Sequence, residues 1–496
     1  MVGRLSDWKG RFGTGLMVAL FFLFLIRCLA AAFLPLTPDE AYYWTWSKDL
    51  QGGYPDHPFM VAGWIAAGTA LFGDTAFGVR VLGPVSALIG TCFLFVAARR
   101  FGNAVGDTAG DDRAALRAAA LLNGTLALNL GGALMTPDTP LLFFVALFLL
   151  AAVSIGNPGG QRWWLVAGLA AGLGFDSKYT MLLPVAGLGL WALTSQEGRR
   201  HLRTWWPWAG LLLAVILTFP VLEWNATHHW ASFLKQGGRV GDWHPARAVQ
   251  FMGELLGGQI GLATPGVFIF FVMGVRYLWR LRTAQARMLL WLILLPAGVF
   301  VFHAFGDRVQ ANWPVILYPF LAVGGGYVLL PGCRIAVVTG FVLSCCILLQ
   351  AATGLLPLGR HFDVTLRQGG GWDELASEIR RTVTEPEAVI IADEYGLASE
   401  MAFRLPERTI AGLDPRWGMF GFPSLSCRDV AGRPLFLLRS ERRHDAPDSW
   451  LSVIGMAGEV VRQRKGREAE RYRLFRVSCR PDMPPGDHAA LLPHPR

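Results

Sequence analysis

Long apolar runs with short polar connections dominate the chain from residue 12 to residue 352. The first run, residues 12–36, contains one charged residue, Arg27, and is long enough to cross a hydrocarbon layer of about 30 Å as a helix. Reading the apolar windows with their charged flanks predicts eleven membrane spans. They cover residues 14–36, 79–98, 114–134, 140–156, 162–176, 179–194, 205–223, 260–279, 287–305, 313–330 and 334–352.

After residue 352 the pattern changes to that of a small soluble α/β domain. Residues 372–383 (WDELASEIRRTV) predict an amphipathic helix, residues 388–392 a strand, residues 397–403 a second helix and residues 435–438 a further strand. We therefore expect a transmembrane domain over 1–352 and a soluble α/β domain over 353–480. Residues 481–496, rich in Pro and His, predict a disordered tail.

Charge along the chain predicts its orientation. The connections on the side of the N-terminus, together with the adjoining span ends, contain sixteen Lys and Arg, and those on the opposite side contain seven up to residue 352. By the positive-inside rule the N-terminus is cytoplasmic, and an odd number of spans then sends the C-terminal domain to the outer face. The basic segment Met1–Arg11 before an apolar run is also typical of a cleaved signal peptide. The length of that run, the charge of Arg27 within it and the many further spans favour a retained signal-anchor helix.

Composition agrees with a polytopic α-helical membrane protein. Hydrophobic residues make up 53% of the chain and charged residues 16%, and the mean hydropathy is +0.38. The net charge of +9 is explained by topology and gives no reason to expect a nucleic-acid partner. Among seven cysteines there is no Cys-x-x-Cys pair; Cys427 and Cys479 lie in the polar C-terminal part and would bridge in an oxidising compartment.

Two adjacent carboxylates, Asp39 and Glu40, follow the first apolar run directly. Carboxylates beside apolar surroundings are candidate general bases or metal ligands, and the alternative is that they only solvate the end of the span. They open a long outer loop, residues 37–78, in which Pro58–Phe72 is apolar but too short to span and predicts interfacial helices.

Most other polar clusters beside span ends also lie on the predicted outer face. Asp138 stands between two prolines, where it either presents a carboxylate next to Asp39 or only forms a turn and cap. Lys178 is the single cation of its hairpin and either binds phosphate or snorkels. A second outer loop, residues 224–259, is rich in Trp and His, as at a membrane interface that holds an anionic head group. The candidate substrate-binding residues are Tyr42, Tyr43, Asp56, His57, Lys178, Tyr179, His228, His229, Arg308 and Asn312.

The histidines His57, His228 and His229 lack the tight spacing of a metal site, so the metal-ligand interpretation is the weaker one for them. We assign no metal ligands and no certain cofactor, and leave a divalent metal open. The absence of a Walker loop and of a Gly-x-Gly-x-x-Gly segment after a strand gives no indication of a nucleotide site.

The order of these features resembles a known family. It comprises an acidic pair after span one, a Thr-Pro-Asp turn after span three, the Ser177–Tyr179 hairpin, a Trp- and His-rich outer loop and Asn312-Trp313-Pro314. This order is similar to that of GT-C superfamily glycosyltransferases of the dolichyl-phosphate-mannose-protein mannosyltransferase-like branch, which includes the bacterial lipid A aminoarabinose and galacturonic acid transferases. The likeness covers roughly residues 14–350.

The resemblance implies inverting transfer of one sugar from a polyprenyl-phosphate donor to lipid A, a glycan or another envelope acceptor. The reaction would take place at the periplasmic face of the bacterial inner membrane, in contact with membrane lipids. Asp39 matches the family's catalytic base or acceptor-orienting acid, and Glu40 and Asp138 match its companions.

One segment departs from the aminoarabinose transferases. They carry Lys-Pro-Pro in the first outer loop, whereas this chain has Asp56-His57-Pro58-Phe59, which leans toward the galacturonic-acid type. Two other hypotheses stay open. A transporter or flippase for a lipid-linked sugar would show inverted repeats and midplane polar groups, which we do not detect in the sequence. A sugar-polymer ligase or polymerase would use the same chemistry on a different acceptor.

Overall fold

The computed structural model describes residues 3–105, 112–157, 159–237, 243–480, 485–486 and 488–495, which form two compact units. The helical unit comprises residues up to Ala31, Gly52–Val61 and Arg80–Cys345, and the sheet unit comprises Ala32–Gln51, Ala62–Val79 and the residues from Cys346 onward. This division differs from the predicted boundary at residue 352, because parts of the first outer loop pack with the C-terminal residues. Residues 238–242 of the predicted loop 224–259 lie outside the described residues.

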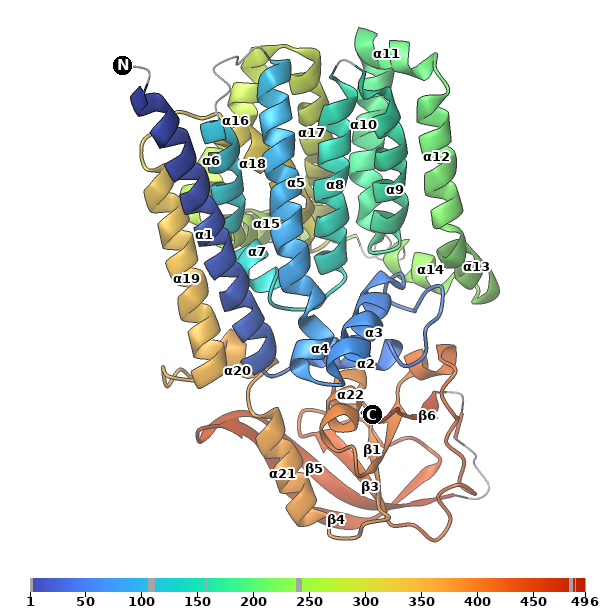
Figure 1. Cartoon of the computed structure of the whole chain (residues 1–496). Coiled ribbons are helices and arrows are strands. Elements are labelled where there is room, and N and C mark those ends of the chain that lie inside the picture. The colour runs from blue at the N-terminus through green and yellow to red at the C-terminus, as the bar shows by residue number, and fades with distance from the viewer. Residues whose placement is uncertain are drawn as a thin grey trace. The chain divides into compact units, whose positions relative to one another are not determined.

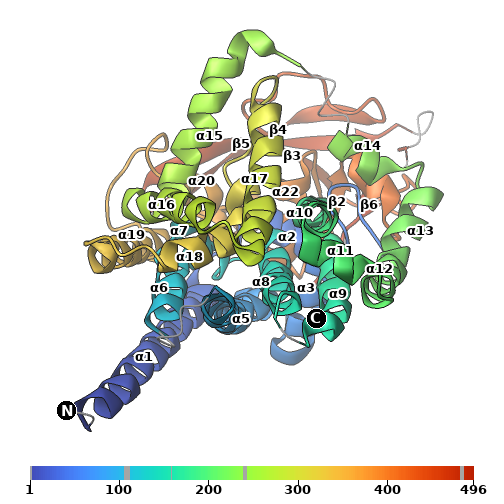
Figure 2. The same ribbon diagram turned by 90° about the horizontal axis from the view of Figure 1, so that it is seen from above.

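The helical unit contains most of the apolar windows, and α1, α3, α4 and α19 continue from one unit into the other. Several of its helices run side by side, as Figure 1 shows in side view and Figure 2 from above. Its elements are α1 (Gly3–Phe33), α5 (Leu82–Ala104), α6 (Asp112–Asn123), α7 (Leu126–Gly131), α8 (Asp138–Ile155), η1 (Gly160–Arg162), α9 (Trp163–Phe175), η2 (Tyr179–Met181), α10 (Leu182–Thr194), α11 (Gln196–Leu202), α12 (Trp206–Leu217), α13 (Phe219–Thr227), α14 (Ala231–Gly237), η4 (Pro245–Arg247), α15 (Ala248–Ala263), α16 (Pro265–Leu281), α17 (Ala284–Ala304), η5 (Trp313–Leu317), α18 (Tyr318–Gly326) and α19 (Cys333–Thr353).

The predicted helical membrane architecture is confirmed, while the number of eleven spans stays a prediction. Among the described residues, four helices are long and apolar enough to cross a membrane, and seven if each bent helix pair counts as one span. The four are Ala76–Ala104, Asp138–Ile155, Ala284–Ala304 and Cys333–Thr353. Residues 114–134 are not one helix, because α6 ends at Asn123 and Thr125 caps a new helix by accepting a hydrogen bond from the Leu128 amide.

Arg27, the single charge of the first apolar run, is buried in the helical unit. Its Nη2 donates to Asn123 Oδ1 and to Asn129 Oδ1, each at 3.0 Å. Asn123 in turn donates to Thr91 Oγ1 at 3.0 Å. The guanidinium is thus held by amide oxygens from α6 and α7, which offsets part of the cost of burying a polar group among helices.

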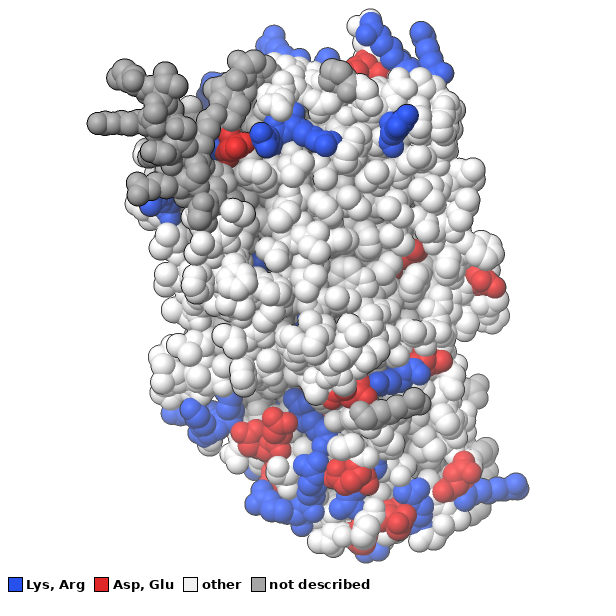
Figure 3. Space-filling model, in the orientation of Figure 1, with Lys and Arg blue, Asp and Glu red and all other residues white. Residues whose placement is uncertain are grey.

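Helices α9 and α12 approach closely at two glycines. A side chain at Gly168 would place its first carbon 2.0 Å from the backbone oxygen of Gly210. Small residues at helix contacts allow such backbone approach, and they are common in membrane helix bundles. On the face drawn in Figure 3, the surface over α5, α8 and α9 has few charged side chains between the helix ends, whereas many gather over the sheet unit.

The sheet unit is built around six strands in the order β4-β5-β3-β1-β2-β6. Strand β1 pairs in parallel with β2 and β3, while β5 pairs antiparallel with β3 and β4, and β6 antiparallel with β2. Its elements are α2 (Pro38–Trp46), α3 (Met60–Phe72), α4 (Ala76–Arg80), α20 (Val364–Gln368), α21 (Trp372–Thr382), β1 (Val389–Ala392), α22 (Tyr395–Arg404), β2 (Thr409–Leu413), η6 (Pro415–Met419), β3 (Leu435–Ser440), β4 (Leu451–Arg464), β5 (Arg467–Cys479) and β6 (Ala489–Leu491).

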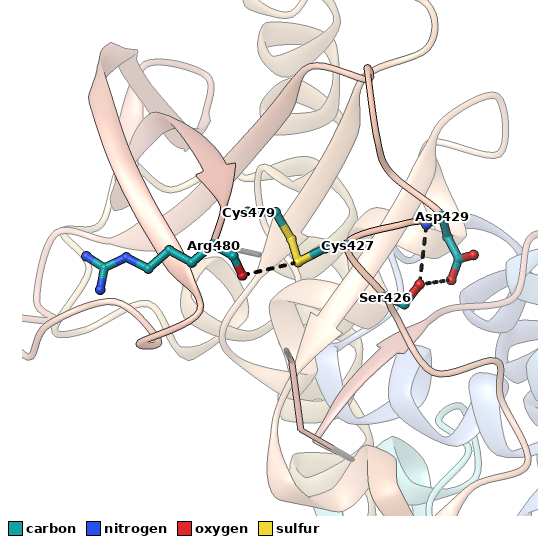
Figure 4. The surroundings of a disulfide bond; sticks show 5 residues. All are labelled: Ser426, Cys427, Asp429, Cys479 and Arg480. Carbon is teal, nitrogen blue, oxygen red and sulfur yellow. Dashed lines mark hydrogen bonds between the residues drawn. A yellow bond between two sulfur atoms is a disulfide. The ribbon is translucent and has the colours of Figure 1, made fainter. Parts of the chain in front are cut away.

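The predicted helices and strands at 372–383, 388–392, 397–403 and 435–438 are confirmed, with small shifts of their ends. The prediction of a disordered tail over 481–496 is wrong for β6, whose backbone extends the sheet by pairing with β2. In this tail, residues 481–484, 487 and 496 lie outside the described residues. Cys427 and Cys479 form a disulfide across 52 residues, and Figure 4 shows Ser426 and Asp429 beside it.

Candidate functional site

The acidic pair lies at the amino end of α2 in the sheet unit. Thr37 Oγ1 accepts a hydrogen bond from the Glu40 amide at 3.3 Å, and Glu40 Oε2 accepts from the Thr37 amide at 3.1 Å. This capping box, with Pro38 at the first helical position, is a start signal written in the local sequence. It gives the two acids different environments: Glu40 is completely buried, while Asp39 is exposed.

The remainder of α2 is fixed by aromatic packing within the sheet unit. Tyr42 contacts the rings of Tyr395 and Trp417, with centroids 4.7 and 5.6 Å away. Tyr42 is 2% exposed and Tyr43 is also buried, so α2 presents Asp39 from a rigid helix. The predicted substrate-binding role of the two tyrosines stays a prediction, and their observed contacts are with neighbouring rings.

In the helical unit, three of the predicted residues meet in one cluster, which we name the Asp138 cluster: Asp138, Lys178 and Asn312. Lys178 Nζ lies 2.7 Å from Asp138 Oδ1, and Asn312 Nδ2 donates to Asp138 Oδ2, also at 2.7 Å. The side chains of Lys178 and Asp138 are 9% and 19% exposed. An ammonium and an amide therefore hold both oxygens of one partly buried carboxylate.

Each member of the Asp138 cluster stands at a helix boundary. Asp138 is the first residue of α8, after a turn in which Thr139 Oγ1 lies 3.1 Å from the Thr136 amide and 3.1 Å from the Leu134 carbonyl oxygen. Lys178 is the extended residue before η2, and Asn312 precedes η5. Polar side chains at such ends gather at one place when the helices pack together.

A second set of contacts joins the remaining outer segments of the helical unit. The hydroxyls of Tyr179 and Ser232 are 2.5 Å apart, and Ser232 donates to Asn225 Oδ1 at 2.8 Å. Lys235 Nζ lies 2.5 Å from Asp56 Oδ1. These contacts tie the hairpin near residue 56 and the turn near residue 179 to α13 and α14.

The other predicted residues make separate contacts. Arg308 pairs with Glu254 at 2.8 Å, and His228 stacks on Trp224 with ring centroids 4.3 Å apart. His229 is exposed with a positive φ of 54°, and His57 is half-buried in the hairpin. Within the described ranges, no three His, Cys, Asp or Glu side chains gather as metal ligands would.

Two residues that lie beside α2 were not predicted from the sequence. Tyr395 donates to Asp39 Oδ1 at 3.0 Å, and the Arg416 guanidinium lies 4.2 Å from the centre of the Tyr395 ring. A signal for Tyr395 existed, because it follows the carboxyl end of the predicted strand 388–392, where parallel sheets present functional side chains. Asp39 and Glu40 belong to the sheet unit and Asp138 to the helical unit, and the predicted approach of Asp39 to Asp138 stays a prediction.

Comparison with known proteins supports the predicted resemblance. Residues 56–224 match the family model described as dolichyl-phosphate-mannose-protein mannosyltransferase. The lipid A galacturonosyltransferase RgtD of Rhizobium johnstonii is 28% identical over 422 residues, which cover 80% of this chain and 85% of RgtD. The undecaprenyl phosphate-alpha-4-amino-4-deoxy-L-arabinose arabinosyl transferase 1 of Pseudomonas fluorescens is 28% identical over 319 residues, 57% of this chain and 54% of that protein.

The fold is that of a solved structure. ArnT from Cupriavidus metallidurans, crystallised with undecaprenyl phosphate, superposes with a TM-score of 0.61 and 16% identity, over 93% of this chain and 98% of ArnT. The apo form gives a TM-score of 0.60 over the same shares. The chain therefore has the ArnT fold.

Proposed function

We propose that this chain, a GT-C-type membrane protein similar to glycosyltransferases of lipid A, transfers a single sugar from a polyprenyl-phosphate donor to an envelope acceptor. Lipid A is the acceptor we favour, since RgtD is named a lipid A galacturonosyltransferase. The polyprenyl-phosphate donor follows the arabinosyl transferase, which is named for an undecaprenyl-phosphate sugar. Galacturonic acid is the sugar we favour, because the RgtD similarity extends along most of both chains and the Asp56-His57-Pro58 segment departs from the aminoarabinose type.

The observation that carries this proposal is the Asp138 cluster. Lys178 supplies an ammonium that is mostly shielded from water and already held in place by Asp138 and thereby by Asn312. A shielded ammonium binds a phosphate strongly, and the carboxylate keeps the lysine charged and oriented until the donor arrives. A lipid-linked donor presents its phosphate where apolar helices end, which is where these three residues stand.

The reaction we assign is an inverting displacement. The hydroxyl oxygen of the acceptor attacks the first carbon of the sugar, and the bond from that carbon to the phosphate oxygen breaks. The electron pair leaves on the polyprenyl phosphate, whose charge Lys178 neutralises. Asp39 accepts the hydroxyl proton, since it is an exposed carboxylate on a rigid helix, whereas Glu40 serves to hold the amino end of α2.

We place this reaction at the periplasmic face of the inner membrane. The disulfide between Cys427 and Cys479 is typical of an oxidising compartment, and the charge bias of the connections puts the N-terminus in the cytoplasm. The two arguments use different residues and give the same orientation.

A transfer assay in detergent tests the proposal. Purified protein is incubated with undecaprenyl-phosphate galacturonic acid and lipid A, and separately with the aminoarabinose donor, and the products are weighed by mass spectrometry. We expect one added sugar per acceptor. The Asp39→Asn variant should lose at least 100-fold in rate, the usual scale for a general base. Glu374→Gln, which changes an exposed acid of the same unit, is the matched control.

The assay in detergent also distinguishes the transferase hypothesis from that of a transporter or flippase, because transport requires two compartments separated by a membrane and sugar transfer does not. Acceptor that stays unmodified with either donor, by a protein that remains folded, would overturn the proposal. Full activity in Asp39→Asn would remove Asp39 as the base while leaving the transfer itself standing.

A further inference from the structure

The amino ends of α2 and α22 meet inside the sheet unit. Tyr395 is the first residue of α22, and its hydroxyl donates to Asp39 Oδ1 across 3.0 Å. The two residues are 356 positions apart in the sequence. The C-terminal sheet domain therefore contributes a hydrogen-bond donor directly to the carboxylate that we assign as the base.

The Tyr395 ring is held on two sides. Tyr42 packs against it edge-on with centroids 4.7 Å apart, and the guanidinium of Arg416 lies 4.2 Å from its centre. Asp414 fixes Arg416 through an ion pair of 2.9 Å. Packing and the cation together restrict the ring, so the position of its hydroxyl is set before any substrate binds.

The cation also changes the strength of the donor. A positive charge over a phenol ring draws electron density from it and makes its O–H a stronger hydrogen-bond donor. A stronger donor stabilises the ionised form of the carboxylate that accepts from it. Arg416 thus acts on Asp39 through Tyr395.

We propose that Tyr395 is a positioning residue for Asp39 and that Arg416 supports it. Tyr395 fixes the rotation of the Asp39 carboxylate and keeps it ionised, which is the form a general base needs. The inference rests on the proposed role of Asp39. It gives the sheet domain a direct part in the reaction, in addition to any part in binding the acceptor.

Other charged groups surround this arrangement on each packed element. On α2 the neighbour is Glu40, which is engaged in the capping box, and on η6 the neighbours are Arg416 and Asp414. On α22 they are Glu394, before the helix, and the buried Glu400, five residues after Tyr395. A test must therefore change the Tyr395 hydroxyl alone. The Tyr395→Phe variant does so, because it keeps the ring and its packing.

The experiment measures kcat and KM for sugar transfer between pH 5 and pH 9 in the wild type, Tyr395→Phe and Arg416→Gln. In Tyr395→Phe we expect kcat to fall about 10-fold, with donor KM unchanged, and the acidic limb of kcat/KM to move up by about one pH unit. Arg416→Gln should shift the limb in the same direction by less. Tyr277→Phe, in α16 of the helical unit, is the matched control and should behave as the wild type.

A second readout does not depend on catalysis. The pH midpoint of carbodiimide labelling of Asp39, followed by mass spectrometry, should rise in Tyr395→Phe by the same amount as the acidic limb. An unmoved midpoint and acidic limb in Tyr395→Phe would overturn the inference, whether or not the melting temperature falls. If the wild type transfers no sugar, the proposed function fails, and the labelling still decides whether Tyr395 controls Asp39.

Discussion

Removing the lysine of the Asp138 cluster should separate its structural role from its role in catalysis. Lys178 Nζ and Asp138 Oδ1 are 2.7 Å apart, which at an effective dielectric constant of about 20 is a gross attraction of about 6 kcal/mol. Much of this attraction is offset by the cost of desolvating both groups. What a variant reveals is the penalty for leaving one charge buried without its partner, about 3–5 kcal/mol.

For Lys178→Met we expect the lower end of that range, about 3 kcal/mol, because Asn312 still donates to Asp138 and the carboxylate is partly exposed. The double variant Asp138→Asn with Lys178→Met removes the orphaned charge and should recover most of the lost stability. Neither Lys178→Met nor the double variant should transfer sugar, since both lack the ammonium that we assign to the donor phosphate. Stability and activity should therefore respond differently to the second substitution.

The assays are thermal unfolding in detergent and the transfer reaction. They are run on the wild type, on Lys178→Met, on Asp138→Asn and on the double variant. Lys178→Arg is the conservative control, because it keeps the charge and should hold the melting temperature near that of the wild type. Two results would refute the reasoning. If Lys178→Met has the melting temperature of the wild type, water screens the ion pair and the expected loss of about 3 kcal/mol in the free energy of unfolding is wrong. If the double variant transfers sugar at the wild-type rate, Lys178 does not bind the donor phosphate.

Two further predictions concern the stability of the sheet unit. Burial raises the pKa of Glu400 to about 7, although the charge of Arg404 acts in the opposite direction. The folded state therefore binds a proton at Glu400 more tightly than the unfolded state does. The free energy of unfolding should fall by up to about 3 kcal/mol as the pH rises from about 4.5 to 7. Chemical denaturation at several pH values should show this slope in the wild type and a flatter one in Glu400→Gln; equal slopes would contradict it. Replacing Cys427 and Cys479 by Ala should cost about 4 kcal/mol, from the loop entropy of a bridge across 52 residues, and reductant should have the same effect on the wild type alone.

The features that the sequence predicted well are those with a local cause. Apolar windows correspond to helices because each must satisfy its own backbone in an apolar layer, and this holds whatever the neighbours are. The Thr37-Pro38-Asp39-Glu40 stretch predicts both a helix start and an acidic pair, since a capping box needs residues three positions apart. The alternation of helix and strand between residues 372 and 440 was readable for the same reason.

Other elements gave little local signal. Strand β5 carries Arg or Glu at six of its 13 positions, and β4 exposes the apolar run 453–457, so no clean alternation of apolar and polar residues marks them. Strand β6 is three residues long in a Pro- and His-rich segment, and it exists because the edge of β2 offers backbone groups to pair with.

By itself the sequence determined where most of the helices lie and where the acidic pair stands, and it named candidate residues for sugar transfer that stay a prediction. Only the tertiary structure decided their partners. Lys178 meets Asp138 across 40 residues, Asn312 meets Asp138 across 174, and Tyr395 meets Asp39 across 356. No local pattern encodes such pairs, because each depends on how packed helices and a closed sheet bring distant backbone together, and the contact energy appears only after that packing has offset the entropy of closing the loops.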